Sequence, residues 1–316
     1  MRLAFSVSGR RSAGAAVRLA VEAEQAGYDE IWVTEDYCER GAFAVAGAMA
    51  GATSTMRIGI GVVNPFTRHP ALVAMETAAL AELAPGRVVL GLGASNRRWM
   101  QDQLGIPFER PVGRLAEALA VVRDLLACQA VDHDGVSFTV HTRLSSPVAQ
   151  PPPIVLGVKG PRAIRLAADE ADGLLLSVLS SAPYVRRVRS TVGSGLTLSG
   201  YVSFAFDPRR EVARDRVRDT VATFLGVHGD AEITRSAGLP AELSETFRAG
   251  WLAGSPRLDL VTDHLLDTFA VAGDREDCAR GLAALAAAGL DVAVIRDDDG
   301  PDPAAILKHA RAAWGR

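Results

Sequence analysis

A short apolar run stands at residues 58–65: Ile58-Gly59-Ile60-Gly61-Val62-Val63-Asn64-Pro65. It ends in a polar turn, and a helix-forming segment follows at Ala71–Leu83. Short strands that are almost wholly apolar, each followed by a helix, are typical of a parallel sheet covered on both faces, because a crossover helix must connect neighbouring strands. The run therefore predicts a buried parallel strand followed by its crossover helix.

The same alternation extends outward in both directions along the chain. The predicted strands are Leu3–Ser8, Ile31–Thr34, Ile58–Val63, Val88–Gly93, Ile154–Val158, Leu174–Val178, Leu198–Phe206 and Val292–Ile295. The helices predicted after them are Ala13–Ala26, Ala42–Ala52, Ala71–Leu83, Val112–Leu126, Arg162–Ala171, Tyr184–Val192, Val212–Leu225 and Ala304–Ala313. Eight such units in 316 residues favour a closed (β/α)₈ TIM barrel of the α/β class over an open sheet.

Two stretches exceed the basic barrel plan. Gln129–Gln150 follows the fourth helix, and its His133-Asp134-Gly135 motif predicts a hairpin turn between short strands. Gly226–Ala272 precedes the last strand and is expected to form several short helices. Neither has the composition of a linker, so residues 1–316 are interpreted as a single domain with insertions after helix 4 and before strand 8.

Composition excludes several classes of protein. With 48% hydrophobic and 22% charged residues, the chain can bury a sizeable core and is not disordered. Its 34 basic and 37 acidic residues give a net charge of −3 and no basic arm, so no nucleic-acid partner is expected. The chain lacks the roughly 18 consecutive strongly apolar residues of a membrane span, so we expect no membrane association and a cytoplasmic location.

Cysteine usage gives no sign of a metal or disulfide framework. Cys38, Cys128 and Cys278 are odd in number and far apart, with no CxxC spacing and no histidine placed for zinc. We expect no metal site.

Chemistry in a (β/α)₈ barrel takes place at the carboxyl ends of the strands. The second predicted strand ends with adjacent carboxylates, Glu35 and Asp36, and the fourth is followed by Asn96. Glycines concentrate at the ends of strands 3, 4 and 5, where they favour a bulge or the close approach of a ligand. The carboxyl end of the barrel is therefore the expected site.

Five segments, in order, carry a family resemblance. They are Trp32–Tyr37, Gly59–Pro65 with Arg68-His69-Pro70, Gly86–Gly93, Pro153–Gly160 and Ala171-Asp172-Gly173. Together they resemble the bacterial-luciferase-like family of flavin- and deazaflavin-dependent oxidoreductases. The similarity is greatest to the coenzyme F420-dependent branch, which includes methylenetetrahydromethanopterin reductase.

The resemblance implies a cofactor site. The matching branch has a non-proline cis peptide on strand 3 behind the deazaflavin ring, and the matching bond here is Gly61–Val62. The stretch at residues 157–160 resembles the one where family backbone amides approach the cofactor, and a helix N-terminus after it favours an anion. The cofactor-binding residues so implied are Ser6, Gly61, Val62, Val63, Asn64, Asn96, Gly157, Val158, Lys159, Gly160 and Ser177.

The departures from the family pattern concern the proton donor. Many relatives carry a histidine at the position of Asp36, an acidic residue at that of Asn96 and, in some, an acid at that of Ser6. The catalytic candidates here are therefore Asp36, Glu35 and Asn96. Of these, Asp36 and Glu35 are the general-acid candidates, because a carboxylic acid in an apolar barrel mouth can have its pKa raised. Of the two adjacent carboxylates, Glu35 is the better candidate for a structural salt bridge with an arginine.

The leading functional hypothesis is an F420-dependent reductase that transfers hydride to a C=N or activated C=C bond of a small molecule. An FMN-dependent monooxygenase of the luciferase type stays open as an alternative, and so does a flavin-binding barrel without catalysis. The resemblance also implies a homodimer, for which residues Phe43–Ala52 offer a small apolar helix face.

Overall fold

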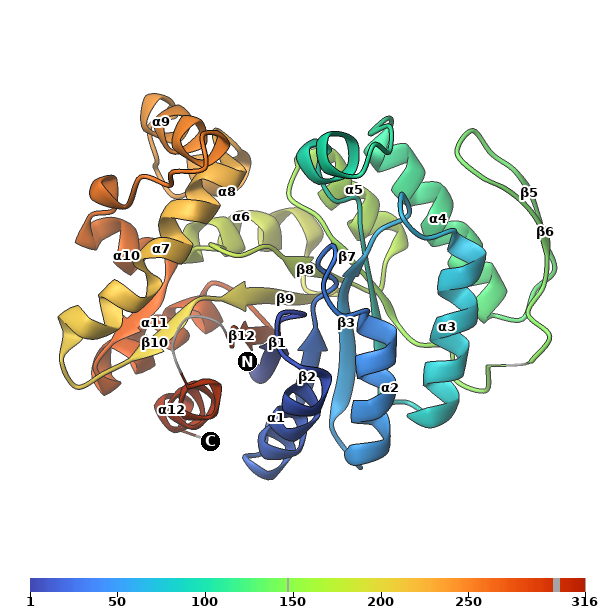
Figure 1. Cartoon of the computed structure of the whole chain (residues 1–316), viewed down its shortest axis with the longest axis horizontal. Coiled ribbons are helices and arrows are strands. Elements are labelled where there is room, and N and C mark those ends of the chain that lie inside the picture. Colours follow the sequence, from blue (N-terminus) through green and yellow to red (C-terminus); the bar gives the residue numbers. More distant parts are fainter. Residues whose placement is uncertain (147, 298–301, 316) are drawn as a thin grey trace.

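The computed structural model describes residues 1–146, 148–297 and 302–315. Its centre is a closed barrel of parallel strands in the order β1-β12-β9-β8-β7-β4-β3-β2 (Figure 1). The barrel strands are β1 Arg2–Val7, β2 Glu30–Val33, β3 Arg57–Val63, β4 Val88–Gly93, β7 Ile154–Gly157, β8 Gly173–Leu176, β9 Thr197–Val202 and β12 Val292–Ile295. The predicted TIM barrel is confirmed.

Helices surround this barrel. Those that follow a barrel strand are α1 Ala13–Gln25, α2 Ala42–Ala52, α3 Pro70–Leu83, α4 Pro111–Leu126, α5 Pro161–Glu170, α6 Ala182–Val192, α7 Arg210–His228 and α12 Pro303–Trp314. Several begin at a proline in the first turn, which suits a position whose N–H has no helical partner. Most of the core lies between the barrel and this helical layer.

A second, smaller core fills the barrel itself. It contains Ala4, Trp32, Val89, Val155, Leu175, Val292 and Val294. Because side chains alternate along a strand, the residues two positions further on face the same interior, closer to the carboxyl ends of the strands. The interior core therefore forms the floor of the expected site.

One predicted strand is divided in the structure. The expected Leu198–Phe206 strand stops at Val202, and β10 Phe204–Phe206 leaves the barrel to pair in parallel with β11 Val271–Gly273. Its continuous apolar character is explained by burial on both sides of the break, since Val202 and Phe204 are both buried. Sequence alone gave no sign of β11.

The insertions also differ in detail from expectation. A hairpin is present, β5 Val131–Asp134 with β6 Thr139–Thr142, but His133 and Asp134 lie in its first strand and not in the turn. The second insertion contains α8 Glu232–Arg235, α9 Ala241–Leu252, the 3₁₀ helix η2 Leu258–Leu260 and α10 Asp263–Phe269. Two helices were not predicted, the π-helix η1 Arg98–Gln103 and α11 Arg275–Ala287.

Within the described residues, no helix combines the length and apolar character that a membrane span requires.

Candidate functional site

Strand β3 carries the predicted irregularity. The Gly61–Val62 peptide is cis, and the pairing of β3 with β4 shifts register between Ile60 and Val63. The prediction of a cis bond at this position is confirmed. The bulge lies near the carboxyl end of β3, which is where the chemistry of such barrels takes place.

The Val62 side chain packs against glycines of β4 and β7. A Cβ placed on Gly93 of β4 would stand 2.5 Å from Val62 Cγ2, and one on Gly157 of β7 would stand 2.8 Å from Val62 Cγ1. Only glycine leaves room for the bulge at these positions. Val62 itself is partly exposed, so the bulge presents its side chain as a surface at the barrel mouth.

Tyr201 supports this bulge from the opposite strand. β9 lies four strands from β3 in either direction around the barrel, and the Tyr201 hydroxyl donates to the Gly61 carbonyl at 2.7 Å. Burial raises the pKa of the Tyr201 phenol, and the charge of Asp36 adds to that shift. The hydroxyl therefore stays protonated and holds the bulge across the full width of the barrel.

Glu35 has a structural role. Its Oε1 accepts from Arg68 Nε at 2.7 Å, and its Oε2 accepts from the Ala42 N–H at 3.2 Å, at the start of α2. The Arg68 guanidinium also pairs with Glu76 of α3 at 2.8 Å. As expected from the sequence, this carboxylate forms a salt bridge, here one that joins the end of β2 to α2 and to the loop before α3.

Asp36 has a different environment. Its Oδ2 accepts a hydrogen bond from Thr34 Oγ1 at 2.8 Å, and no ion pair of Asp36 is found among the described residues. Burial raises the pKa of the Tyr37 and Tyr201 phenols, and the charge of Asp36 adds to both shifts, whereas that of Glu35 is found only in the Tyr37 shift. Asp36 is therefore the carboxylate of this pair that faces the barrel mouth.

Asn96 caps a helix. Its Oδ1 accepts from the Trp99 N–H at 3.1 Å at the start of η1, so its carboxamide oxygen is already engaged. Trp99 in turn packs edge-on against Tyr37, with ring centroids 5.3 Å apart. η1 is also fixed to the second insertion, because the Arg98 guanidinium lies 4.3 Å from the centroid of the Trp251 ring.

The other predicted residues on β1, β3 and β7 divide into two groups. Val63, Asn64 and Val158 are buried, so the side chains of the two valines pack away from the mouth. Ser6 continues the interior face of β1 beyond Ala4, and Ser177 does the same on β8 beyond Leu175. Ser6 and Ser177 thus lie on the side of the barrel wall that faces the site.

Lys159 follows β7 and directly precedes Gly160, the N-cap of α5. Burial lowers the pKa of its ammonium, and no hydrogen bond or ion pair of that ammonium is found among the described residues. Burial and the nearby Lys159 charge lower the pKa of His228, at the end of α7, to about 3. His228 is thus neutral and donates from Nε2 to the Val178 carbonyl at 2.8 Å.

Next to Lys159, α5 begins at an uncapped terminus. Gly160 is its N-cap and supplies no side-chain acceptor, and a Cβ built on Gly160 would meet only open space. The free N–H groups and the positive end of the helix dipole favour an anion there. The bulge at Gly61–Val62 of β3 offers a partly apolar surface, and Lys159 with the start of α5 offers positive charge after β7. Together these two features fit a flat ring system that carries a phosphate.

Sequence reasoning missed several residues that line this mouth. Tyr201, Ser95, His228 and Arg296 were not identified, and Tyr37 was noted only as part of a motif. Arg296 follows Val294 on the interior face of β12. For Tyr201 and Arg296 a signal existed, since both stand two positions beyond interior residues, but it required the barrel register.

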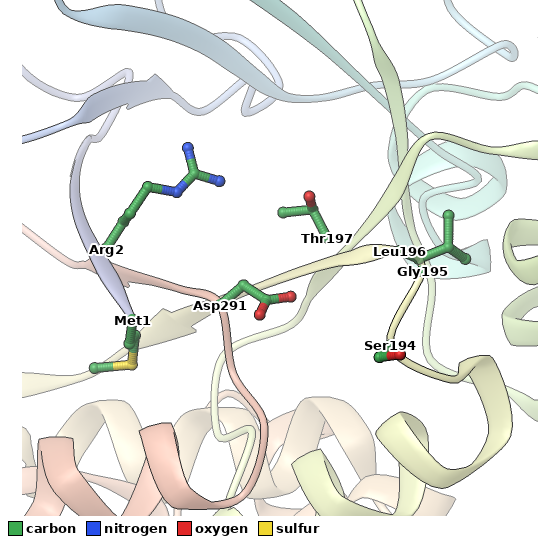
Figure 2. A pocket seen from close by; sticks show the side chains of 7 residues that line it. All are labelled: Met1, Arg2, Ser194, Gly195, Leu196, Thr197 and Asp291. Atoms are coloured by element: carbon green, nitrogen blue, oxygen red, sulfur yellow. The ribbon is translucent and has the colours of Figure 1, made fainter.

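Two further observations concern the described residues outside this mouth. Among the described residues, no group of three or more metal-binding side chains is close enough to hold an ion. A surface pocket lies at the opposite end of the barrel, where the strands begin (Figure 2). Its charged residues are already paired: Arg2 with Glu30 at 2.7 Å, and Asp291 with Arg189 at 2.5 Å.

Comparison with known proteins agrees with this geometry. The family model described as "Luciferase-like monooxygenase" matches residues 2–292. A 5,10-methylenetetrahydromethanopterin reductase from Archaeoglobus fulgidus is 30% identical over 298 residues, covering 89% of this chain and 88% of the relative.

Solved structures show the same fold. The coenzyme F420 dependent tetrahydromethanopterin reductase from Methanopyrus kandleri superposes with a TM-score of 0.85 at 21% identity, covering 98% of this chain and 97% of the other. The oxygenating constituent of 3,6-diketocamphane monooxygenase from Pseudomonas putida, in complex with FMN, gives a TM-score of 0.71 at 17% identity and covers 100% and 98%. The chain belongs to the luciferase-like monooxygenase family.

Proposed function

We propose that this protein is an F420-dependent oxidoreductase that acts as a reductase on a small molecule with an electron-poor C=N or C=C bond. The observation that carries the proposal is the bulge at Gly61–Val62, which packs against glycines of β4 and β7, with Lys159 just after β7. The similarity to reductases from Archaeoglobus and Methanopyrus supports the same class. FMN stays the alternative cofactor, because a structural neighbour holds it.

The residues of this chain fit the cofactor at both ends. Val62 and the glycines around it would lie behind the ring, and Lys159 with the first turn of α5 would hold the phosphate. When bound, the deazaflavin supplies the hydride, and the protein supplies orientation and exclusion of water.

The floor of the site is held by contacts within the protein. The Tyr201 hydroxyl holds the Gly61 carbonyl, and Trp32 fills the barrel below. Asp36, at the end of β2, is the carboxylate we propose to orient the substrate or to give it a proton. Glu35 and Asn96, which the sequence also offered, hold helix termini.

The test is a pair of binding titrations with F420 and FMN, followed by turnover assays. We expect F420 to be retained with a dissociation constant in the micromolar range or below, and no oxygen consumption with reduced FMN. Retention of FMN together with FMN-dependent oxygen consumption would establish the monooxygenase alternative. Retention of either cofactor without turnover of any electrophile would indicate a non-catalytic barrel.

The chain offers a matched pair of variants for the phosphate site, since Lys159 and Lys308 are its only lysines. Lys159→Gln is expected to weaken F420 binding about tenfold or more, since a charge-assisted contact contributes roughly 1.5–3 kcal/mol. Lys308→Gln, at an exposed position of α12, should bind as the parent does. Equal affinities for the two variants would remove Lys159 from the cofactor site.

A further inference from the structure

Three side chains at the ends of β2, β3 and β4 form a hydrogen-bonded chain at the mouth. Asn64 Nδ2 contacts the Tyr37 hydroxyl at 3.0 Å, and the Tyr37 hydroxyl contacts Ser95 Oγ at 2.6 Å. Asn64 stands two residues beyond the cis peptide, and β2, β3 and β4 are neighbours in the barrel. The chain therefore runs beside the bulge where the cofactor ring is proposed to lie.

The direction of this chain follows from its buried end. Asn64 Oδ1 accepts from the N–H groups of Phe66 and Thr67, both at 2.9 Å, so the carboxamide oxygen must face the backbone. Its Nδ2 group is then a donor toward Tyr37, because an amide nitrogen has no lone pair to offer. The Tyr37 oxygen accepts from Asn64, and its own proton is directed to Ser95.

Ser95 is the open end of the chain. Its oxygen accepts from Tyr37, which leaves its own hydroxyl proton to donate, and no acceptor for that proton is found among the described residues. Ser95 is partly exposed and has a φ of 64°, in the left-handed region that a residue other than glycine seldom adopts. Such backbone strain is concentrated at functional sites.

We infer that the Ser95 hydroxyl is the hydrogen-bond donor for a lone pair on the substrate, a carbonyl oxygen or an imine nitrogen, and that Tyr37 and Asn64 are positioning residues that turn it outward. This inference rests on the proposed function. It narrows the substrate class to electrophiles whose reduced bond includes, or is conjugated with, such an acceptor. It also leaves Asp36 to orient the substrate.

The protons transferred along this hydrogen-bonded chain of side chains balance. A bound reduced deazaflavin would supply hydride to the substrate carbon, the π electron pair would move to the oxygen or nitrogen, and that atom would take the proton of Ser95. Ser95 takes the proton of Tyr37, and water later returns one to the phenol. Burial raises the pKa of the Tyr37 phenol to about 12. This value is still below the pKa of water, roughly 15.7, so an alkoxide is basic enough to take the phenol proton.

The activity test uses cyclohexanone as the carbonyl probe and 1-pyrroline as the imine probe, with the F420-loaded enzyme. Ser95→Ala and Tyr37→Phe are each expected to lower kcat by about 10- to 100-fold while F420 affinity stays unchanged. The kcat of the double variant should lie within about threefold of the kcat of the slower single variant, because both changes interrupt the same hydrogen-bonded chain. Additive losses, or a Tyr37→Phe enzyme as fast as the parent, would overturn the relay.

A near-isosteric variant tests the direction of the chain. In Asn64→Asp one carboxylate oxygen still accepts from the N–H groups of Phe66 and Thr67. The second carboxylate oxygen replaces the Nδ2 donor of Asn64, so the Tyr37 hydroxyl must donate to it. Ser95 then donates inward to Tyr37. We expect kcat to fall as far as in Ser95→Ala although both hydroxyls are present. Parental kcat in a folded Asn64→Asp enzyme would refute the assigned direction.

A readout independent of turnover is the ¹³Cζ NMR signal of Tyr37 in cofactor-free protein labelled at tyrosine. Asn64→Asp should raise the pKa of Tyr37, and millimolar cyclohexanone should shift the Tyr37 signal in the parent but not in Ser95→Ala. Tyr28→Phe, which removes a buried hydroxyl bonded to the Leu307 carbonyl, is the control and should change neither result. If these NMR changes are absent while F420 binds and turns over, the Ser95 inference fails and the proposed function stands. If the NMR changes are present but F420 does not bind, the hydrogen-bonded chain stands and the proposed function fails.

Discussion

Adjacent residues with the same functional group can have different roles when their side chains point to opposite sides of the chain. Glu35 and Asp36 stand side by side at the end of β2, but Glu35 pairs with Arg68 and the α2 terminus, whereas the Asp36 carboxylate accepts from the Thr34 hydroxyl. Successive side chains of an extended segment point to opposite sides. One carboxylate is therefore used by the scaffold, and the other is available to the site.

Asp36→Asn is expected to preserve F420 binding and to lower kcat by about tenfold or more, because the substrate loses the charge that orients it. Steady-state kinetics with the true substrate and a fluorescence titration of F420 measure the two effects. Asp124→Asn, at an exposed position of α4, is the control. Loss of F420 binding in Asp36→Asn would place Asp36 in the cofactor site instead.

Glu35→Gln should act chiefly on stability. The amide cannot satisfy both Arg68 and the Ala42 N–H as a carboxylate does, and the start of α2 loses a negative charge. We expect a loss of about 1–2 kcal/mol in the free energy of unfolding, after allowance for solvent screening of the half-buried Arg68. Urea unfolding measures it; Glu82→Gln, exposed on α3, should unfold as the parent does.

At the scale of the elements, Glu24 joins α1 to the turn that precedes β3. Its Oε1 accepts from the backbone N–H groups of Ser54, Thr55 and Met56 at 2.7–3.0 Å. Burial acts to raise the pKa of Glu24, but these hydrogen bonds outweigh it and lower the pKa to about 2. One carboxylate thus fixes the approach of the chain to the strand that bears the bulge.

This lowered pKa predicts a pH dependence. Because the folded-state pKa lies below the ordinary value of 4.5, the stabilisation is complete above about pH 4.5 and is lost as the pH falls toward 2. Glu24→Gln should therefore cost about 1–2 kcal/mol at pH 7. The difference from the parent should shrink steadily below pH 4.5 in urea unfolding. Glu22→Gln, exposed on the same helix, should show no such trend.

At the scale of the whole molecule, an apolar face is left uncovered on neighbouring helices α2 and α3. Leu72, Met75 and Leu83 of α3 are 52%, 53% and 61% exposed. A Cβ on Gly47 of α2 would lie 3.8 Å from Leu83, so the two helices form one surface. Exposed large apolar side chains are typical of an interface, and small residues on α2 allow close approach.

We expect this face to pair with a second copy of the chain. Sedimentation velocity at micromolar concentration should show a dimer, and Met75→Lys should shift it to a monomer by placing a charge in the buried contact. Val136→Lys is the matched control, because Val136 is also exposed, at 78%, but lies in the β5–β6 hairpin. A parent protein that sediments as a monomer would count against the dimer.

The barrel was predictable from the sequence because its cause is local. Each strand is a short apolar run that is largely buried, and several helices begin at residues that favour that position, such as the proline that opens α3, α4 and α5. Where a second strand pairs outside the barrel, as β10 does with β11, the apolar pattern is the same and the prediction was wrong. Burial is visible in a sequence, but the partner that provides it is not.

For the site, the sequence determined where the chemistry lies, through the glycines and polar residues at successive strand ends and the Gly61–Val62 bond that the family resemblance implied. Only the tertiary structure decided which side chains meet there. Tyr37 and Ser95 are 58 residues apart, and Tyr201 and Gly61 are 140 apart. Such contacts depend on closure of the barrel and on the register between strands, which place residues from distant segments within hydrogen-bonding distance. No local pattern in the chain encodes that distance.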